Sequence, residues 1–159
     1  MKKRASRLTG GCACGAVRYR LLAEPMRVHC CHCHACQKQT GGAFAINAII
    51  ETENIRLLKG RPVAVPVPRA HGPHDIHRCR KCGTAVWSDY GRRKGVRFVR
   101  AATLDDPHRL RPDIHIFTRA KVPWVRLADG KPAFRDYYET KREWPKTAYA
   151  RLMKALAAR

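Results

Sequence analysis

The sequence lacks any long apolar run. None of its hydrophobic stretches approaches the roughly 20 residues that a membrane-spanning helix needs. The first residues, MKKRASRLTGG, carry the basic charges with which a signal peptide begins, but no apolar segment follows them. The chain also has no linker, repeat or low-complexity block. We therefore expect one folded protein in the cytoplasm, where thiols stay reduced, and no membrane partner.

Acidic residues are scarce. The 159 residues include 12 Asp and Glu against 33 Lys and Arg, which gives a formal charge of +21. Such a surface attracts nucleic acid or anionic small molecules, or it is simply a solvated basic surface. The basic residues are spread along the chain, and no aromatic–basic motif of a nucleic-acid reader occurs. Nucleic acid is therefore a partner that the sequence allows but does not favour. The oligomeric state stays open.

Alternating and β-branched segments predict a mainly β protein. Strands are expected at Ala16–Leu22, Met26–His29, Ala43–Ile50, Asn54–Leu58, Pro62–Pro68, Thr84–Ser88, Val96–Ala102, Ile114–Thr118 and Pro123–Leu127. Three prolines place the segment Pro62–Pro68 at a sheet edge, because proline cannot donate a ladder hydrogen bond.

From Lys146 onward the pattern changes to that of an amphipathic basic helix. Its apolar positions follow helical spacing and its cations lie mainly on the other face, with Pro145 near the first turn. The apolar residues are Tyr149, Leu152, Met153 and Leu156, and the cations are Arg151, Lys154 and Arg159. Such a helix docks on the sheet or binds a partner.

Eight cysteines in a cytoplasmic chain indicate metal binding before disulfides. The motif C-x-C at Cys12 and Cys14 and the motif C-x-x-C at Cys79 and Cys82 are each followed by glycine. Glycine supports the sharp turn that lets two neighbouring thiolates reach one ion. Together the four thiolates predict a closed zinc site that joins distant parts of the chain.

The middle group differs, because Cys31, Cys33 and Cys36 come from one short segment. Three thiolates leave the fourth tetrahedral position of a zinc ion open, which is typical of catalytic zinc. The alternative is that a protein side chain closes the site, the candidates being Cys30, His29, His34 and His77. A redox or metal-handling role for Cys30 and Cys31 is a further alternative.

These motifs resemble a known family. GGCACGAVRY, CHCHACQKQTGGAF and HRCRKCGTAVW are similar to segments of the glutathione-dependent formaldehyde-activating enzymes, a family that also takes in centromere protein V. ATLDDPHRLRPDIHIFTRAKVPWV and GKPAF resemble the C-terminal half of the same family, so the resemblance runs from about Leu8 to about Phe134. It implies packed antiparallel sheets around a zinc ribbon, as in methionine sulfoxide reductase B. Residues 1–138 would form this domain and residues 139–159 a basic helical extension.

The resemblance also implies an activity. The enzyme would be a carbon–sulfur lyase resembling S-(hydroxymethyl)glutathione synthase, which joins glutathione, or another small thiol, to formaldehyde. It implies two zinc ions, a structural one at Cys12, Cys14, Cys79 and Cys82 and a catalytic one at Cys31, Cys33 and Cys36. The alternative from another class is a zinc-stabilised nucleic-acid or chromatin module without catalysis.

Further residues are candidates by position only. His32 and His34 flank Cys33, so either could move a proton, or both could orient the segment. Lys38 and the backbone at Gly41 and Gly42 could hold a glutathione carboxylate, unless Lys38 is simply solvated. His115 and Trp124 match family motif positions, and we expect both to be buried for packing.

Overall fold

The structure of the chain is a computed structural model that describes residues 8–68 and 72–157. The strands are β1 (Thr9–Gly11), β2 (Arg18–Leu21), β3 (Arg27–Cys31), β4 (Ala45–Glu51), β5 (Ile55–Lys59), β6 (Val63–Pro66), β7 (His74–Arg78), β8 (Ala85–Tyr90), β9 (Val96–Arg100) and β10 (Ile114–Ile116). The α-helices are α1 (His34–Thr40), α2 (Thr140–Glu143) and α3 (Lys146–Ala157), and four short 3₁₀ turns lie between these elements.

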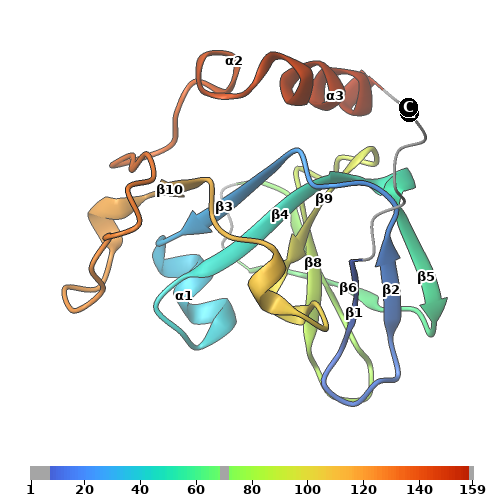
Figure 1. Cartoon of the computed structure of the whole chain (residues 1–159). Coiled ribbons are helices and arrows are strands. Elements are labelled where there is room, and N and C mark those ends of the chain that lie inside the picture. The colour runs from blue at the N-terminus through green and yellow to red at the C-terminus, as the bar shows by residue number, and fades with distance from the viewer. Residues whose placement is uncertain (1–7, 69–71, 158–159) are drawn as a thin grey trace.

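Two sheets form the body of the molecule (Figure 1). The smaller sheet has the order β1-β2-β5 and the larger one the order β10-β3-β4-β9-β8-β7-β6. Between the named strands, the pairings are antiparallel except that of β10 with β3. The mainly β fold with a C-terminal helix is thus confirmed, with the larger sheet mixed rather than purely antiparallel. The proline-rich strand β6 lies at a sheet edge, as predicted.

The central strands of the larger sheet are buried on both faces. Successive side chains of a strand point to opposite faces, and the register aligns Val28, Ala48 and Val99 on one of them. These residues pack with Tyr19 and Leu21 of the smaller sheet. The opposite face carries Cys31, Ile49 and Val96, which pack beneath the C-terminal segment through Trp144, Ala148 and Leu152. The chain therefore has three layers, formed by the small sheet, the large sheet and the C-terminal helices.

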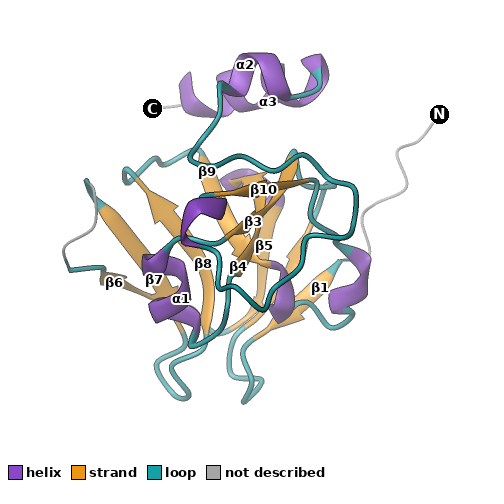
Figure 2. Ribbon diagram, turned by 90° about the vertical axis from the view of Figure 1, so that its left-hand side faces the viewer, coloured by secondary structure: helices purple, strands orange, loops and turns teal. Residues whose placement is uncertain are grey.

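Helices α2 and α3 lie together on one side of the sheets in both views (Figures 1 and 2). Arg151 of α3 donates two hydrogen bonds of 2.7 Å to the Glu51 carboxylate at the end of β4. Trp144 is buried, and its indole N–H donates to the Tyr138 hydroxyl at 2.6 Å. The expectation that the amphipathic helix docks on the sheet is confirmed.

Some of the expected elements are absent or differ. Pro123–Leu127 is a turn followed by irregular chain rather than a strand, and Trp124, expected to be buried, is 75% exposed. The sequence pattern predicted a strand here, but this segment does not pair with another strand among the described residues. Strands β1 and β7 went unpredicted, because β1 is glycine-rich and β7 is mostly polar. Arg159 of the predicted helix lies outside the described residues.

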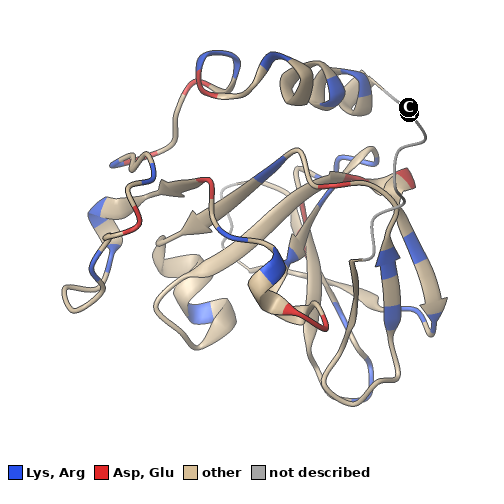
Figure 3. Ribbon diagram, in the orientation of Figure 1, with Lys and Arg blue, Asp and Glu red and all other residues tan. Residues whose placement is uncertain are grey.

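Within residues 8–68 and 72–157, no helix combines the length and the apolar character that crossing a bilayer requires. Lys and Arg are distributed over many elements of the ribbon (Figure 3). The charge distribution agrees with the spread of basic residues along the sequence.

Candidate metal centres and cavity

Cys12, Cys14, Cys79 and Cys82 come together as predicted, and we call them the four-cysteine cluster. All four sulfur atoms lie within 4.8 Å of one another. The Sγ atoms of Cys12 and Cys14 are 3.6 Å apart, and those of Cys14 and Cys79 are 3.8 Å apart. Tetrahedral zinc with Zn–S bonds of about 2.3 Å requires sulfur separations of about 3.8 Å. The donor set and the spacing therefore fit zinc.

The backbone of the four-cysteine cluster has the geometry that the glycines predicted. Gly15 and Gly83 have φ values of 70° and 73°, in the left-handed region that favours glycine. Backbone N–H groups also point at the sulfurs, with Val17 donating to Cys12 at 3.2 Å. Hydrogen bonds from Thr84 lower the pKa of the Cys82 thiol to about 5. The neighbouring sulfurs raise the pKa of Cys14, so within the cluster the thiolate, which is the zinc-binding form, is favoured at Cys82.

The four-cysteine cluster joins two sheets. Cys12 and Cys14 follow β1 of the smaller sheet, whereas Cys79 and Cys82 lie in the turn between β7 and β8 of the larger sheet. A bound ion would hold these two sheets at one end of the molecule, which suits a structural site.

Cys31, Cys33 and Cys36 form a second group, the three-cysteine cluster, with sulfur atoms again within 4.8 Å of one another. Cys31 ends β3, and Cys33 is the N-cap of α1, where its sulfur accepts the Cys36 backbone N–H at 3.3 Å. The short segment that carries these cysteines therefore runs from the end of a strand into the first turn of a helix. Hydrogen bonds from Cys31 and Cys36 lower the pKa of Cys33, while the same bonding raises the pKa of Cys31. The cluster thus stabilises a thiolate on Cys33.

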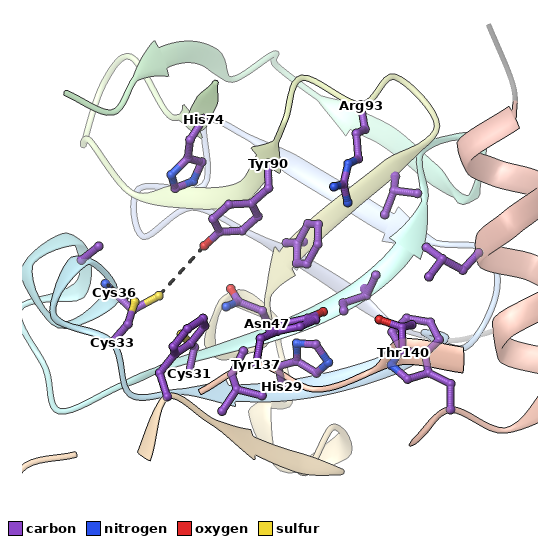
Figure 4. A pocket seen from close by; sticks show the side chains of 18 of the residues that line it. His29, Cys31, Cys33, Cys36, Asn47, His74, Tyr90, Arg93, Tyr137 and Thr140 are labelled. Carbon is purple, nitrogen blue, oxygen red and sulfur yellow. Dashed lines mark hydrogen bonds between the residues drawn. The ribbon is translucent and has the colours of Figure 1, made fainter. Parts of the chain in front are cut away.

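The three-cysteine cluster opens into a cavity of about 840 Å³ between the larger sheet and the C-terminal segment (Figure 4). The sheet contributes Asn47, Phe98 and Arg100 to its wall, and the C-terminal segment contributes Tyr137 and Trp144. A volume of this size is typical of small-molecule sites, whose walls are mostly apolar with a few polar groups. By contrast, the four-cysteine cluster contributes no residue to this cavity.

Arg100 is the most unusual group in the cavity wall. Its side chain is buried and bonded to neutral partners, the amide oxygen of Asn47 and the hydroxyl of Ser88. No carboxylate of the described residues forms an ion pair with its guanidinium. Because a buried charge without a counter-charge is costly, Arg100 favours anions near it, either thiolates of the three-cysteine cluster, whose Cys36 it influences through its charge, or an anionic occupant of the cavity. Nothing in the sequence around Arg100 indicated such a role.

Tyr90 and His74 lie above the three-cysteine cluster in the same cavity (Figure 4). The Tyr90 hydroxyl is 4.0 Å from the Cys36 sulfur, and burial raises the pKa of this phenol, so it stays protonated. The His74 ring stacks on Tyr90 with centroids 4.0 Å apart. Its Nε2 atom is buried without a hydrogen-bond partner among the described residues. Both groups could exchange a proton with a ligand in the cavity.

None of the four residues considered as a further ligand belongs to the three-cysteine cluster. Cys30 groups with His32 and His115 rather than with the three-cysteine cluster. His34 is exposed, and His77 packs beside Trp87 on β8. His29 lines the cavity, but its Nε2 atom is hydrogen-bonded to the Tyr138 hydroxyl at 2.5 Å.

The other polar groups expected at the site do not face the cavity. His32 is fully buried outside it, and Lys38 is exposed on α1 without lining it. Gln37 donates to the backbone oxygens of His32 and Ala120, so it braces the segment. His115 is buried, as expected.

Comparison with known proteins agrees with the motifs. The model of the glutathione-dependent formaldehyde-activating enzyme family matches residues 7–120, and the chain belongs to this family. A Halomonas elongata protein that carries this enzyme name provisionally is 27% identical over 126 residues, which cover 76% of this chain and 80% of the relative. A crystal structure of a Rhodobacter sphaeroides protein is 19% identical, with a TM-score of 0.47, and the match covers 79% of this chain and 98% of that one.

Proposed function

We propose that this chain is a zinc-dependent carbon–sulfur lyase or synthase that joins glutathione, or a similar thiol, to formaldehyde in the cavity beside Cys31, Cys33 and Cys36. The family supports glutathione and formaldehyde as the substrates. The observation that carries the proposal is that three converging thiols form part of the wall of a large cavity. A zinc ion bound by these thiols would supply a position that holds a substrate thiol as its thiolate.

The charges of the cavity wall complement glutathione. Arg93, Arg100 and Lys141 line the cavity together with one acidic residue, Glu139. Glutathione carries two carboxylates and one ammonium group, so the signs match. The buried Arg100 lacks a carboxylate partner, and a substrate carboxylate or thiolate would supply the missing counter-charge.

The reaction moves one proton and involves no redox change. The thiol loses its proton, its sulfur bonds to the carbonyl carbon, the carbonyl π bond breaks, and one proton is delivered to the new hydroxyl oxygen. The protonated Tyr90 phenol lies 4.0 Å from the Cys36 sulfur and is suited to donate this proton, with His74 stacked behind it on the same ring. We therefore assign proton transfer to this pair rather than to His32 and His34, which the sequence had suggested for it.

The C-terminal segment shields this chemistry from water. Tyr137, Trp144, Leu152 and Met153 form the wall opposite the sheet, and all of them lie beyond the part matched by the family model. In this proposal residues 139–159 are an extension of the zinc-binding domain that closes the cavity. Exclusion of water strengthens each polar contact to the substrate.

Calorimetry with glutathione and S-methylglutathione tests the proposal. Glutathione should bind more tightly, because only the free thiol can become a thiolate, and its binding should release a proton. Formaldehyde should disappear faster with enzyme than with glutathione alone, and Cys33→Ser should abolish this difference. Arg100→Met should weaken glutathione binding by about 10- to 100-fold, since a hydrogen bond to a charged group contributes about 1.5–3 kcal/mol. Arg56→Met, at an exposed position on β5, is the matched control. Equal affinities for the two glutathione forms would contradict the proposal.

A further inference from the structure

A third group of potential metal ligands lies behind the three-cysteine cluster. Cys30, His32 and His115 are all buried, and their ligand atoms lie within 4.8 Å of one another. Cys30 precedes Cys31 on β3, so the two side chains point to opposite faces of the sheet. Cys30 is also the direct neighbour of His115 in the parallel pairing of β3 with β10. We call these three residues the Cys-His-His cluster.

The distances in the Cys-His-His cluster fit a tetrahedral ion. The Nε2 atom of His32 lies 3.1 Å from Nδ1 of His115 and 3.5 Å from Sγ of Cys30. For zinc with Zn–N bonds of 2.0–2.1 Å and a Zn–S bond of 2.3 Å, the ligand separations are about 3.4 Å between two nitrogens and about 3.6 Å between sulfur and nitrogen. Small shifts of the side chains would bring these two separations to the values that a bound ion requires.

His115 is oriented as a metal ligand. Its Nε2 atom lies 2.9 Å from the Asp129 carboxylate, whose other oxygen accepts the Lys131 backbone N–H at 3.2 Å. The carboxylate therefore keeps the proton on Nε2 and leaves the Nδ1 lone pair directed at the cluster. A carboxylate behind a histidine is the usual outer partner of a metal-bound imidazole.

Hydrogen bonds within this cluster cannot satisfy all three of its polar side chains. If Nδ1 of His115 is a bare acceptor, Nε2 of neutral His32 must donate its proton to it. The buried Cys30 thiol then has no acceptor on His32, and no other hydrogen bond to Cys30 Sγ is present among the described residues. A metal ion uses all three lone pairs at once. With a divalent ion, the Cys30 thiolate and the Asp129 carboxylate together balance the charge.

We propose that Cys30, His32 and His115 bind a third divalent transition-metal ion, such as zinc, at a site separate from the two cysteine clusters. Cys30 therefore serves a site of its own on the other face of β3. The ion would fasten β3 to β10 immediately before the segment that carries Cys33. This proposal does not depend on the proposed reaction.

Cadmium-113 NMR of the full chain, loaded with ¹¹³Cd under reducing conditions, tests this site. The wild type should show a resonance coupled to ring protons of both His32 and His115, which no all-thiolate site can show. Zinc content should fall by one ion per chain in Cys30→Ser and in His115→Gln. It should be unchanged in His108→Gln, where the histidine is exposed. The remaining cadmium resonances report whether each variant is folded.

Two results would overturn the proposal. One is equal zinc content in the wild type and in folded Cys30→Ser. The other is the absence of cadmium coupling to the rings of His32 and His115 in the wild type, which needs no variant to fold. Either would identify the Cys-His-His cluster as a purely hydrogen-bonded group. Neither result bears on thiol binding at the three-cysteine cluster, so the two proposals can fail separately.

Discussion

Gly95 lies directly against helix α3, and replacing it with alanine should push the helix away from the sheet. A Cβ atom at position 95 would lie 1.8 Å from the Ala155 backbone oxygen and 2.7 Å from its carbonyl carbon. Normal contact requires about 3.5 Å, so the helix or the β9 end must shift by roughly 1.7 Å. The obstacle is backbone at the end of a helix, which cannot rotate aside as a flexible side chain would.

The cost of this shift exceeds the entropic gain of the substitution. Overpacking costs about 1–3 kcal/mol, whereas a Gly-to-Ala change stabilises by about 0.4–1 kcal/mol through the unfolded state. We expect net destabilisation of about 1–2 kcal/mol, which corresponds to a fall in Tm of roughly 2–8 °C. The C-terminal segment should detach before the sheets unfold, because its own packing against Gly95 is what fails.

Thermal unfolding and limited proteolysis measure the two effects. Trypsin should cut the Gly95→Ala variant faster than the wild type within residues 141–154, and the cavity should lose affinity for glutathione. Gly42→Ala is the control, since its Cβ would meet only the Thr40 hydroxyl at an ordinary 3.7 Å. If Gly95→Ala matches the control in both Tm and cleavage, the close packing of α3 on β9 is wrong.

Two further predictions concern the metal clusters and the attachment of α3. Cys82→Ser should unfold or aggregate the protein, because a structural zinc contributes about 10 kcal/mol or more in small zinc domains. Cys33→Ser should stay folded by circular dichroism, and equal melting of the two variants would contradict the division into a structural and a functional cluster. Burial works to raise the pKa of Glu51, but hydrogen bonds from Arg151 and Asn54 outweigh it and hold the pKa below its ordinary value. The stabilisation is therefore complete above the unfolded-state pKa of about 4.3 and is lost as the pH falls through the lower folded-state value. Proteolysis of the C-terminal segment should accelerate over this acidic range in the wild type, and Glu51→Gln should remove that pH dependence.

The sequence by itself determined how the cysteines group into two clusters that could hold a metal ion. Short spacings such as Cys12 to Cys14 bring thiols close through local backbone geometry, and the left-handed glycines follow from the same local requirement. The amphipathic helix could also be predicted from the sequence, since its 3.6-residue period is a local property. Strand β6 was placed at an edge because the chemistry of proline does not depend on the rest of the fold.

Only the tertiary structure decided what each group faces. Cys30 and Cys31 are neighbours in sequence, but Cys30 meets His115, 85 positions further along the chain, because β10 pairs with β3 in parallel. Arg100 became a cavity residue because β9 lies beside β4, and the cavity itself exists because α3 docks through Arg151 and Glu51. Trp124 was expected to be buried because it is a large aromatic residue, but no strand of the described residues covers it. Long-range pairing depends on the packing of the whole chain, which no local pattern of residues specifies.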